Sequence, residues 1–190
     1  MMAYADIAVA LLAAGQSVRF GSDKLLAEIN GEPLGVKAPH MLMNLGFGYH
    51  FAVCRSDGDL AAHYARLGLT VIINDEPERG QAHSLHLAIE GAIATEAKAL
   101  LVILADMPFV SSAHLMALVA AFEGSITAST NGQTSMPPAI FPREDWPDLL
   151  ATSGDAGARG LLANAKLVAA PCEELRDIDV GADLLRPPSQ

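Results

Sequence analysis

Cysteine is scarce in this chain, because Cys54 and Cys172 are the only two cysteines among 190 residues and stand far apart. Neither belongs to a C-x-x-C pair, so the sequence argues against a disulfide framework and against a cysteine-built metal site. A reduced, cytoplasmic protein is therefore the expected setting.

Positive charge is also in short supply, with 12 Lys and Arg against 22 Asp and Glu and a formal net charge of −10. This charge argues against a general nucleic-acid binder, because the phosphate backbone would meet net repulsion. A small anionic ligand held by a local basic loop together with a divalent cation stays compatible with the charge.

Long apolar runs are missing too, since the longest are interrupted well before the roughly 20 residues that a membrane span requires. The first residues carry no basic leader segment, and no repeat at a period of about 20–50 residues is visible. We therefore expect one globular domain over 1–190 that associates with neither membrane nor nucleic acid.

Apolar segments of two kinds alternate along the chain. Continuously apolar runs predict buried strands, and stretches with helical spacing separate them. The expected strands are 7–12, 49–54, 70–73 and 99–104, with weaker candidates at 126–129, 138–141 and 167–170. The expected helices are 33–45, 60–67, 82–97, 111–122, 158–165 and 182–185. This alternation predicts an α/β fold with a mostly parallel sheet covered on both faces.

Three polar clusters follow predicted strands: the loop that begins at Gly15, the loop that ends at Gly80, and Asp106. In open parallel sheets ligands bind outside the carboxyl ends of the strands. The sequence therefore predicts one ligand site built from these three clusters.

The first loop joins Gly15 and Gly21 to Ser17, Arg19 and Lys24. Five residues separate the two glycines and Lys24 follows three residues later, which differs from a Walker A loop, and the G-x-G-x-x-G fingerprint is absent. Glycines would let the backbone approach a triphosphate, while Arg19 and Lys24 would neutralise its charge. A surface turn with solvated charges is the alternative.

The residues of this loop, Leu12-Ala-Ala-Gly15-x-Ser17-x-Arg19-x-Gly21-x-x-Lys24-Leu, resemble the signature of the MobA-like nucleotidyltransferases. Within them, the chain looks closest to the molybdenum cofactor cytidylyltransferases. The resemblance continues through the segments 80–85, 104–108, 138–141, 154–162 and 177–179. It implies a three-layer αβα Rossmann-like fold of the nucleotide-diphospho-sugar transferase type, with a nucleotide-binding half (1–110) and an acceptor-binding half (111–190).

Asp106 follows a wholly apolar strand, where a carboxylate is poorly solvated and needs a counter-charge. The resemblance implies that Asp106 and Asp179 bind Mg²⁺, and two separated carboxylates suit an ion that keeps several waters. Asp177 is the competing candidate for the second position. A turn or helix-capping role is the alternative for Asp106.

The resemblance also assigns the remaining contacts. It implies nucleotide binding at Leu12, Ala13, Ala14, Gly15, Ser17, Lys24, Gly80 and Ser84, with Ser84 and the Ala13-Ala14 pair favouring cytosine. Ser84 is equally suited to a place near a helix start. Asp155 and Arg159, in a glycine-rich turn before a helix, would face the acceptor; an ion pair between them is the alternative. His83 and His86 have the spacing of metal ligands, but no third ligand is visible, so ordinary helix residues are favoured.

The expected activity is transfer of CMP from CTP to the phosphate of the molybdopterin cofactor, with a molybdenum hydroxylase as a possible recipient of the product. Arg19, Lys24 and Asp106 would be the catalytic residues. A GTP-dependent guanylyltransferase, a sugar- or polyol-phosphate nucleotidyltransferase, and a non-catalytic chaperone that binds molybdopterin or a nucleotide are the alternatives.

Overall fold

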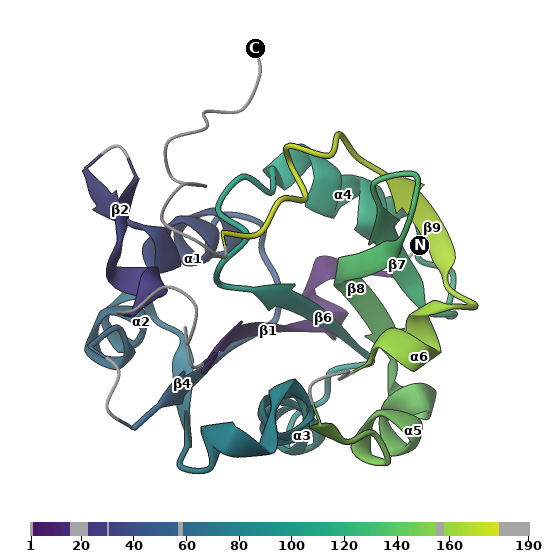
Figure 1. The fold of residues 1–190 in the computed structure, drawn as a ribbon. Coiled ribbons are helices and arrows are strands. Elements are labelled where there is room, and N and C mark those ends of the chain that lie inside the picture. The colour runs from purple at the N-terminus through teal and green to yellow at the C-terminus, as the bar shows by residue number, and fades with distance from the viewer. Residues whose placement is uncertain (1, 16–22, 30, 57–58, 155–157, 179–190) are drawn as a thin grey trace.

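The computed structural model describes residues 2–15, 23–29, 31–56, 59–154 and 158–178. These residues form a seven-stranded sheet in the order β5-β4-β1-β6-β8-β7-β9 (Figure 1). Its strands are β1 (Ile7–Ala13), β4 (Tyr49–Arg55), β5 (Thr70–Asn74), β6 (Ala99–Leu104), β7 (Thr127–Thr130), β8 (Ser135–Pro142) and β9 (Lys166–Ala169). Only β8 among them runs antiparallel to its neighbours. The predicted mostly parallel αβα fold is confirmed.

Helices cover both faces of the sheet (Figure 1). One face packs against α1 (Lys37–Leu42), α2 (Ala61–Leu67) and α4 (Ser112–Ala121), and the other against α3 (Gln81–Ile93), α5 (Trp146–Leu150) and α6 (Arg159–Leu162). Strand β1 supplies alternate residues to the two cores, so all seven of its residues are buried. A strand buried on both sides must be continuously apolar, which is why the pattern of β1 is readable from sequence.

The order of the strands creates a crossover point beside β1. After β1 the chain builds β4 and β5 on one side, and then returns to lay β6 on the other side. Leu12 pairs in register with Leu104, and the Ala105 N–H donates to the Leu12 carbonyl at 3.0 Å. Ligands of open α/β sheets bind at such a switch point. The first loop and Asp106 therefore leave the sheet next to each other.

Several predicted bounds need correction. The helix expected over 82–97 ends at Ile93. The segment expected as one helix over 33–45 consists of the 3-10 turn Leu34–Val36 followed by α1. The helix expected over 158–165 is the shorter α6. The strand expected over 138–141 extends to Ser135–Pro142. A small hairpin, β2 (Glu28–Ile29) and β3 (Glu32–Pro33), and helix α5 were not predicted. The closing helix expected at 182–185 lies outside the described residues.

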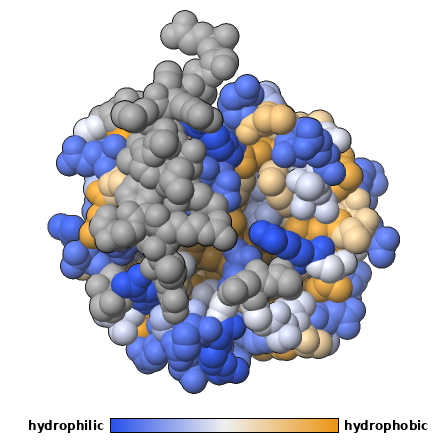
Figure 2. Space-filling view, viewed as in Figure 1, coloured by the Kyte–Doolittle hydropathy of each residue, from blue (hydrophilic) through white to orange (hydrophobic). Residues whose placement is uncertain are grey.

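The surface of one face is shown in Figure 2. Apolar residues gather there over the side of the sheet that carries α4, β7 and β9, where Met116 and Leu167 are among the large apolar side chains that stay exposed. Within the described ranges, no helix combines the length and the apolar character that crossing a bilayer requires.

Candidate active site

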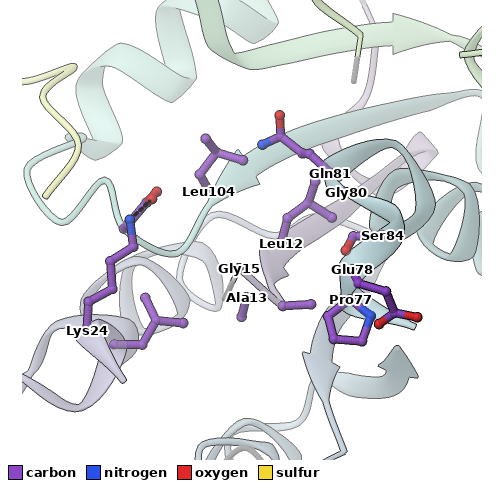
Figure 3. A pocket seen from close by; sticks show the side chains of 13 residues that line it. Leu12, Ala13, Gly15, Lys24, Pro77, Glu78, Gly80, Gln81, Ser84 and Leu104 are labelled. Carbon is purple, nitrogen blue, oxygen red and sulfur yellow. Dashed lines mark hydrogen bonds and ion pairs between the residues drawn. The ribbon is translucent and has the colours of Figure 1, made fainter. Parts of the chain in front are cut away.

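A cavity of about 350 Å³ opens at the carboxyl edge of the sheet. It brings together residues from all three polar clusters that the sequence places after strands (Figure 3). Eight predicted site residues line it: Leu12, Ala13, Ala14, Gly15, Lys24, Gly80, Ser84 and Asp106. The predicted site residues Ser17 and Arg19 lie outside the described residues.

Lys24 and Asp106 form an ion pair inside this cavity, with 2.7 Å between Lys24 Nζ and Asp106 Oδ2. Lys24 begins a 3-10 turn, Lys24–Leu26, whose start is capped by the Asp23 carboxylate accepting from the Leu25 N–H. The two side chains are 11% and 19% exposed, so each charge is largely removed from water and gains a counter-charge from the other. A cation and a carboxylate from distant parts of the chain thus meet at one point.

Asp106 also offers an oxygen for a metal ion. Its Oδ1 is buried and has no hydrogen-bond partner among the described residues. An unpaired buried carboxylate oxygen is costly, and Mg²⁺ is commonly held by one or two carboxylates together with substrate phosphates. Asp106 therefore fits a divalent cation, although the described ranges contain no group of three or more His, Cys, Asp or Glu that could hold one. Asp179, the predicted second ligand, lies outside the described residues.

The Gly80 loop forms the opposite side of the cavity, where Figure 3 shows Pro77, Glu78 and Ser84 across from Lys24. Gly80 has a φ of +84°, which favours glycine, and it directly precedes α3. Ser84 is only 6% exposed, and its Oγ accepts a hydrogen bond from the Asn74 amide at 3.0 Å. This side of the cavity is therefore fixed by the backbone turn and by a buried polar contact.

A second cavity of about 560 Å³ lies beside the first. Its lining combines apolar and polar side chains: Leu104, Met107, Gln133, Thr134, Ser135, Met136, Pro137, Arg159, Leu175 and Asp177. Leu104 lines both cavities, and Arg159 also lines a smaller apolar one that includes Leu12 and Leu104. Arg159, predicted to face the acceptor, thus lies at a hollow next to the first cavity, whereas Asp155 is outside the described residues.

The two helical histidines have other contacts than metal ligation. His83 Nε2 lies 3.7 Å from Glu76 Oε2, and His86 Nε2 lies 3.4 Å from the Thr152 hydroxyl. Both cysteines are free; Cys54 is buried, and burial raises the pKa of its thiol to about 12. Neither cysteine forms a disulfide, and the ordinary helical role of the two histidines stays a prediction.

Sequence reasoning missed several residues of the two cavities. Pro77, Glu78 and Gln81 surround the predicted Gly80, and Leu104 immediately precedes the predicted Ala-Asp106 pair. Their closeness in sequence to predicted residues was an available signal. The segment 133–137 of the second cavity directly precedes 138–141, which carries part of the resemblance, so the same signal was available there.

The fold and the cavity define a class of α/β protein that binds a ligand at the strand carboxyl ends. A family model for the MobA-like NTP transferase domain matches residues 9–170. The chain belongs to this family and is a nucleotidyltransferase of the MobA-like type.

The chain is similar to purine catabolism protein PucB of Bacillus subtilis (strain 168), with 31% identity over 176 residues, 87% of this chain and 85% of PucB. Among solved structures it resembles Rv0371c of Mycobacterium tuberculosis H37Rv, with a TM-score of 0.80, 22% identity and coverage of 93% of this chain and 94% of that one. A further structure of Rv0371c is a complex with manganese, with a TM-score of 0.75, 20% identity and coverage of 93% and 95%.

The molybdopterin-guanine dinucleotide biosynthesis protein A of Archaeoglobus fulgidus is also similar, with a TM-score of 0.61, 21% identity and coverage of 94% of this chain and 95% of that one. These structural likenesses concern the fold, which this chain, Rv0371c and the Archaeoglobus protein share over nearly their whole lengths.

Proposed function

We propose that this protein transfers CMP from CTP to the terminal phosphate of the molybdopterin cofactor and releases pyrophosphate. The observation that carries the proposal is the meeting of Lys24 and Asp106, 82 residues apart, in a cavity whose lining includes Gly15 and Ser84. A cation for phosphates, a carboxylate for a metal, a backbone loop and a hydroxyl for a base are what a nucleotidyl transfer requires.

In the proposed reaction an oxygen of the acceptor phosphate attacks the α-phosphorus of CTP, and the bond from that phosphorus to the bridging oxygen breaks. A phosphate monoester is already ionised near neutral pH, because its second pKa is about 6. No general base is therefore needed, and the chain contributes by positioning and charge neutralisation.

Lys24 would contact the triphosphate, with Arg19 supplying a second cation from the first loop. Asp106 and Asp179 would hold a Mg²⁺ ion, which when bound neutralises charge on the phosphate oxygens. The manganese complex of Rv0371c supports a divalent cation in a protein of this fold. Leu12, Ala13, Ala14, Gly15, Ser17 and Gly80 would shape the nucleotide cavity.

The second cavity would accept the pterin. Arg159 offers a cation for the acceptor phosphate, and Met107, Met136 and Leu175 offer apolar surface for a ring system. The name of the Archaeoglobus protein, which links a protein of this fold to molybdopterin dinucleotide formation, supports this acceptor. Residues 1–110 would then bind the nucleotide and residues 111–190 the acceptor. A molybdenum hydroxylase would receive the product.

The test is a pyrophosphate-release assay with purified molybdenum-loaded molybdopterin and CTP, GTP, ATP or UTP in turn. We expect release with CTP far above the other three. Lys24→Ala should reduce turnover at least about 100-fold, because an electrostatic contact to the transferred phosphates is lost. Lys166→Ala removes the lysine of an exposed ion pair, 2.9 Å from Glu123, and should leave turnover unchanged.

Other outcomes contradict the proposal in distinct ways. Release with GTP alone would identify a guanylyltransferase, and release only with a sugar or polyol phosphate as acceptor would exclude the pterin. Nucleotide binding without release of pyrophosphate from the nucleotide, whichever acceptor is supplied, would identify a carrier protein. Turnover of Lys24→Ala equal to that of Lys166→Ala would remove Lys24 from the mechanism.

A further inference from the structure

Asn74 is a fully buried polar residue at the end of β5, with 0% exposure. Its side chain makes two hydrogen bonds to different parts of the Gly80 region. The amide oxygen accepts from the Glu76 N–H at 2.9 Å, and the amide nitrogen donates to Ser84 Oγ at 3.0 Å. Asn74 thus ties the start of the loop to the first turns of α3.

These two bonds determine the direction of hydrogen bonding at Ser84. A backbone N–H can only donate, so the amide oxygen of Asn74 must face Glu76. The amide nitrogen therefore faces Ser84, and it too can only donate, so Ser84 Oγ must be an acceptor in this contact. The Ser84 proton is left to point elsewhere.

The described residues provide no acceptor for that proton, since the contact with Asn74 is the one hydrogen bond they make with the Ser84 hydroxyl. Ser84 lines the nucleotide cavity on the side away from Lys24 (Figure 3). A buried hydroxyl with an unused proton gains a hydrogen bond only from a ligand or water that presents an acceptor. Ser84 is thereby prepared as a donor toward the cavity.

We propose that Asn74 is a positioning residue for base selection, holding the Ser84 hydroxyl as a donor toward N3 of the bound pyrimidine. The inference rests on the proposed function. Ring nitrogen N3 of cytosine is a hydrogen-bond acceptor, whereas uracil carries an N–H at this position. A hydroxyl held as a donor therefore forms a hydrogen bond with cytosine and meets the N–H of uracil unfavourably. Sites that orient a buried hydrogen-bonding group discriminate far better than apolar pockets do.

The test reverses the direction of the hydrogen bond. In Asn74→Asp, one carboxylate oxygen keeps the Glu76 N–H and the other accepts the Ser84 proton, so Ser84 then presents a lone pair to the base. Dissociation constants of CTP and UTP are measured by isothermal titration calorimetry with Mg²⁺, at a pH where the new carboxylate is ionised. We expect the preference for CTP over UTP to fall at least about tenfold, the effect of one mismatched buried hydrogen bond.

Two further variants separate positioning from a merely structural role. In Ser84→Ala the preference for CTP should fall, and adding Asn74→Asp to it should cause no further change in the ratio of dissociation constants. Asn74→Ala lets the hydroxyl rotate and should lower the preference by less than Asn74→Asp does. If the buried carboxylate prevents Asn74→Asp from folding, the uncharged Asn74→Ala variant still tests whether Asn74 affects the preference for CTP.

The matched control is Asn44→Asp, the same change at an exposed asparagine whose amide donates to the His40 carbonyl. It lies between α1 and the amino end of β4, at the opposite edge of the sheet from the site, and should keep the wild-type ratio. An unchanged ratio in Asn74→Ala, or in a folded Asn74→Asp, would overturn the inference, as would a change that persists in the Ser84→Ala background. A wild-type chain that binds neither CTP nor UTP would overturn the proposed function and this inference with it.

Discussion

His114 is a buried titratable residue that does not line the first cavity. Its Nε2 is 2.8 Å from the Ser129 hydroxyl, and that hydroxyl donates to the Pro138 carbonyl at 2.7 Å. Because Ser129 uses its proton on Pro138, His114 must donate from Nε2, and a neutral ring is sufficient for that. The histidine therefore joins α4 to the paired strands β7 and β8 without needing a charge.

Burial lowers the pKa of His114 below its ordinary value of 6.5, although the nearby Glu174 carboxylate acts in the opposite direction. Below pH 6.5 the unfolded chain then binds a proton that the folded chain does not. This contribution to stability is thus complete above pH 6.5 and is lost as the pH falls from 6.5 through the lower pKa of the folded chain.

We expect the free energy of unfolding, measured with urea, to decrease from about pH 7.5 to about pH 5.5. His114→Gln, whose amide can still donate to Ser129, should show a smaller decrease. His50 and His63, whose pKa values burial also lowers, should leave a residual slope in the variant. Equal slopes for wild type and variant would show that His114 does not contribute.

At the residue scale, the structure brings together two charged residues that the sequence places at one site, while their roles stay predictions. Lys24 and Asp106 were expected at one site and lie 2.7 Å apart in one cavity. The direct ion pair between them was not foreseen, since phosphate and metal were the expected partners. Asn74 begins the polar loop that ends at Gly80, and nothing in its sequence neighbours reveals that its amide is buried and bonded to Ser84.

At the scale of elements, the strands at the centre of the sheet were the easiest to predict. Strand β6 has the predicted bounds, because a strand buried on both faces is apolar throughout and its length can be read from the apolar run. Helix α3 ends four residues before its predicted end, since Thr95 caps the Ala92 carbonyl and the chain turns toward β6. The hairpin β2–β3 has two residues in each strand, too few for a periodic pattern.

The junction between α1 and β4 depends on a close backbone approach at Gly48. A Cβ at this position would lie 2.1 Å from the Ala5 carbonyl oxygen, and the Gly48 N–H donates to the Ile7 carbonyl at 3.1 Å. We expect Gly48→Ala to destabilise the fold by about 1–3 kcal/mol, because backbone atoms cannot move aside as a side-chain tip can. Thermal unfolding followed by circular dichroism measures the change.

The control for this prediction is Gly160→Ala in helix α6, where a Cβ would meet nothing within 4 Å. This variant should unfold at the wild-type temperature or slightly above it, since alanine favours helix over glycine. Destabilisation of Gly160→Ala as large as that of Gly48→Ala would contradict the assigned cause.

At the scale of the whole molecule, the acidic charge of the protein opposes the binding of an anionic ligand. The formal net charge is −10, and the lining of the first cavity includes Glu78 and Asp106 beside Lys24. A triphosphate that enters such a site without a cation meets repulsion from the protein as well as from its own charges.

We therefore expect CTP to raise the melting temperature markedly in the presence of Mg²⁺ and much less in EDTA. A thermal-shift titration in both buffers measures the difference. Without nucleotide, the melting temperature should be the same in both buffers, because the ion is expected to bind together with phosphates. Equal shifts by CTP in Mg²⁺ and EDTA would argue against a metal-assisted site.

The sequence alone determined the class of fold and pointed to three of the segments that line the first cavity, because buried parallel strands require continuous apolar runs and polar clusters follow their carboxyl ends. Only the tertiary structure decided which of these residues meet. The crossover at β1 places Lys24 against Asp106, and the buried amide of Asn74 orients Ser84. Such contacts join residues that no sequence spacing relates, since their distance depends on the order of the strands in the sheet.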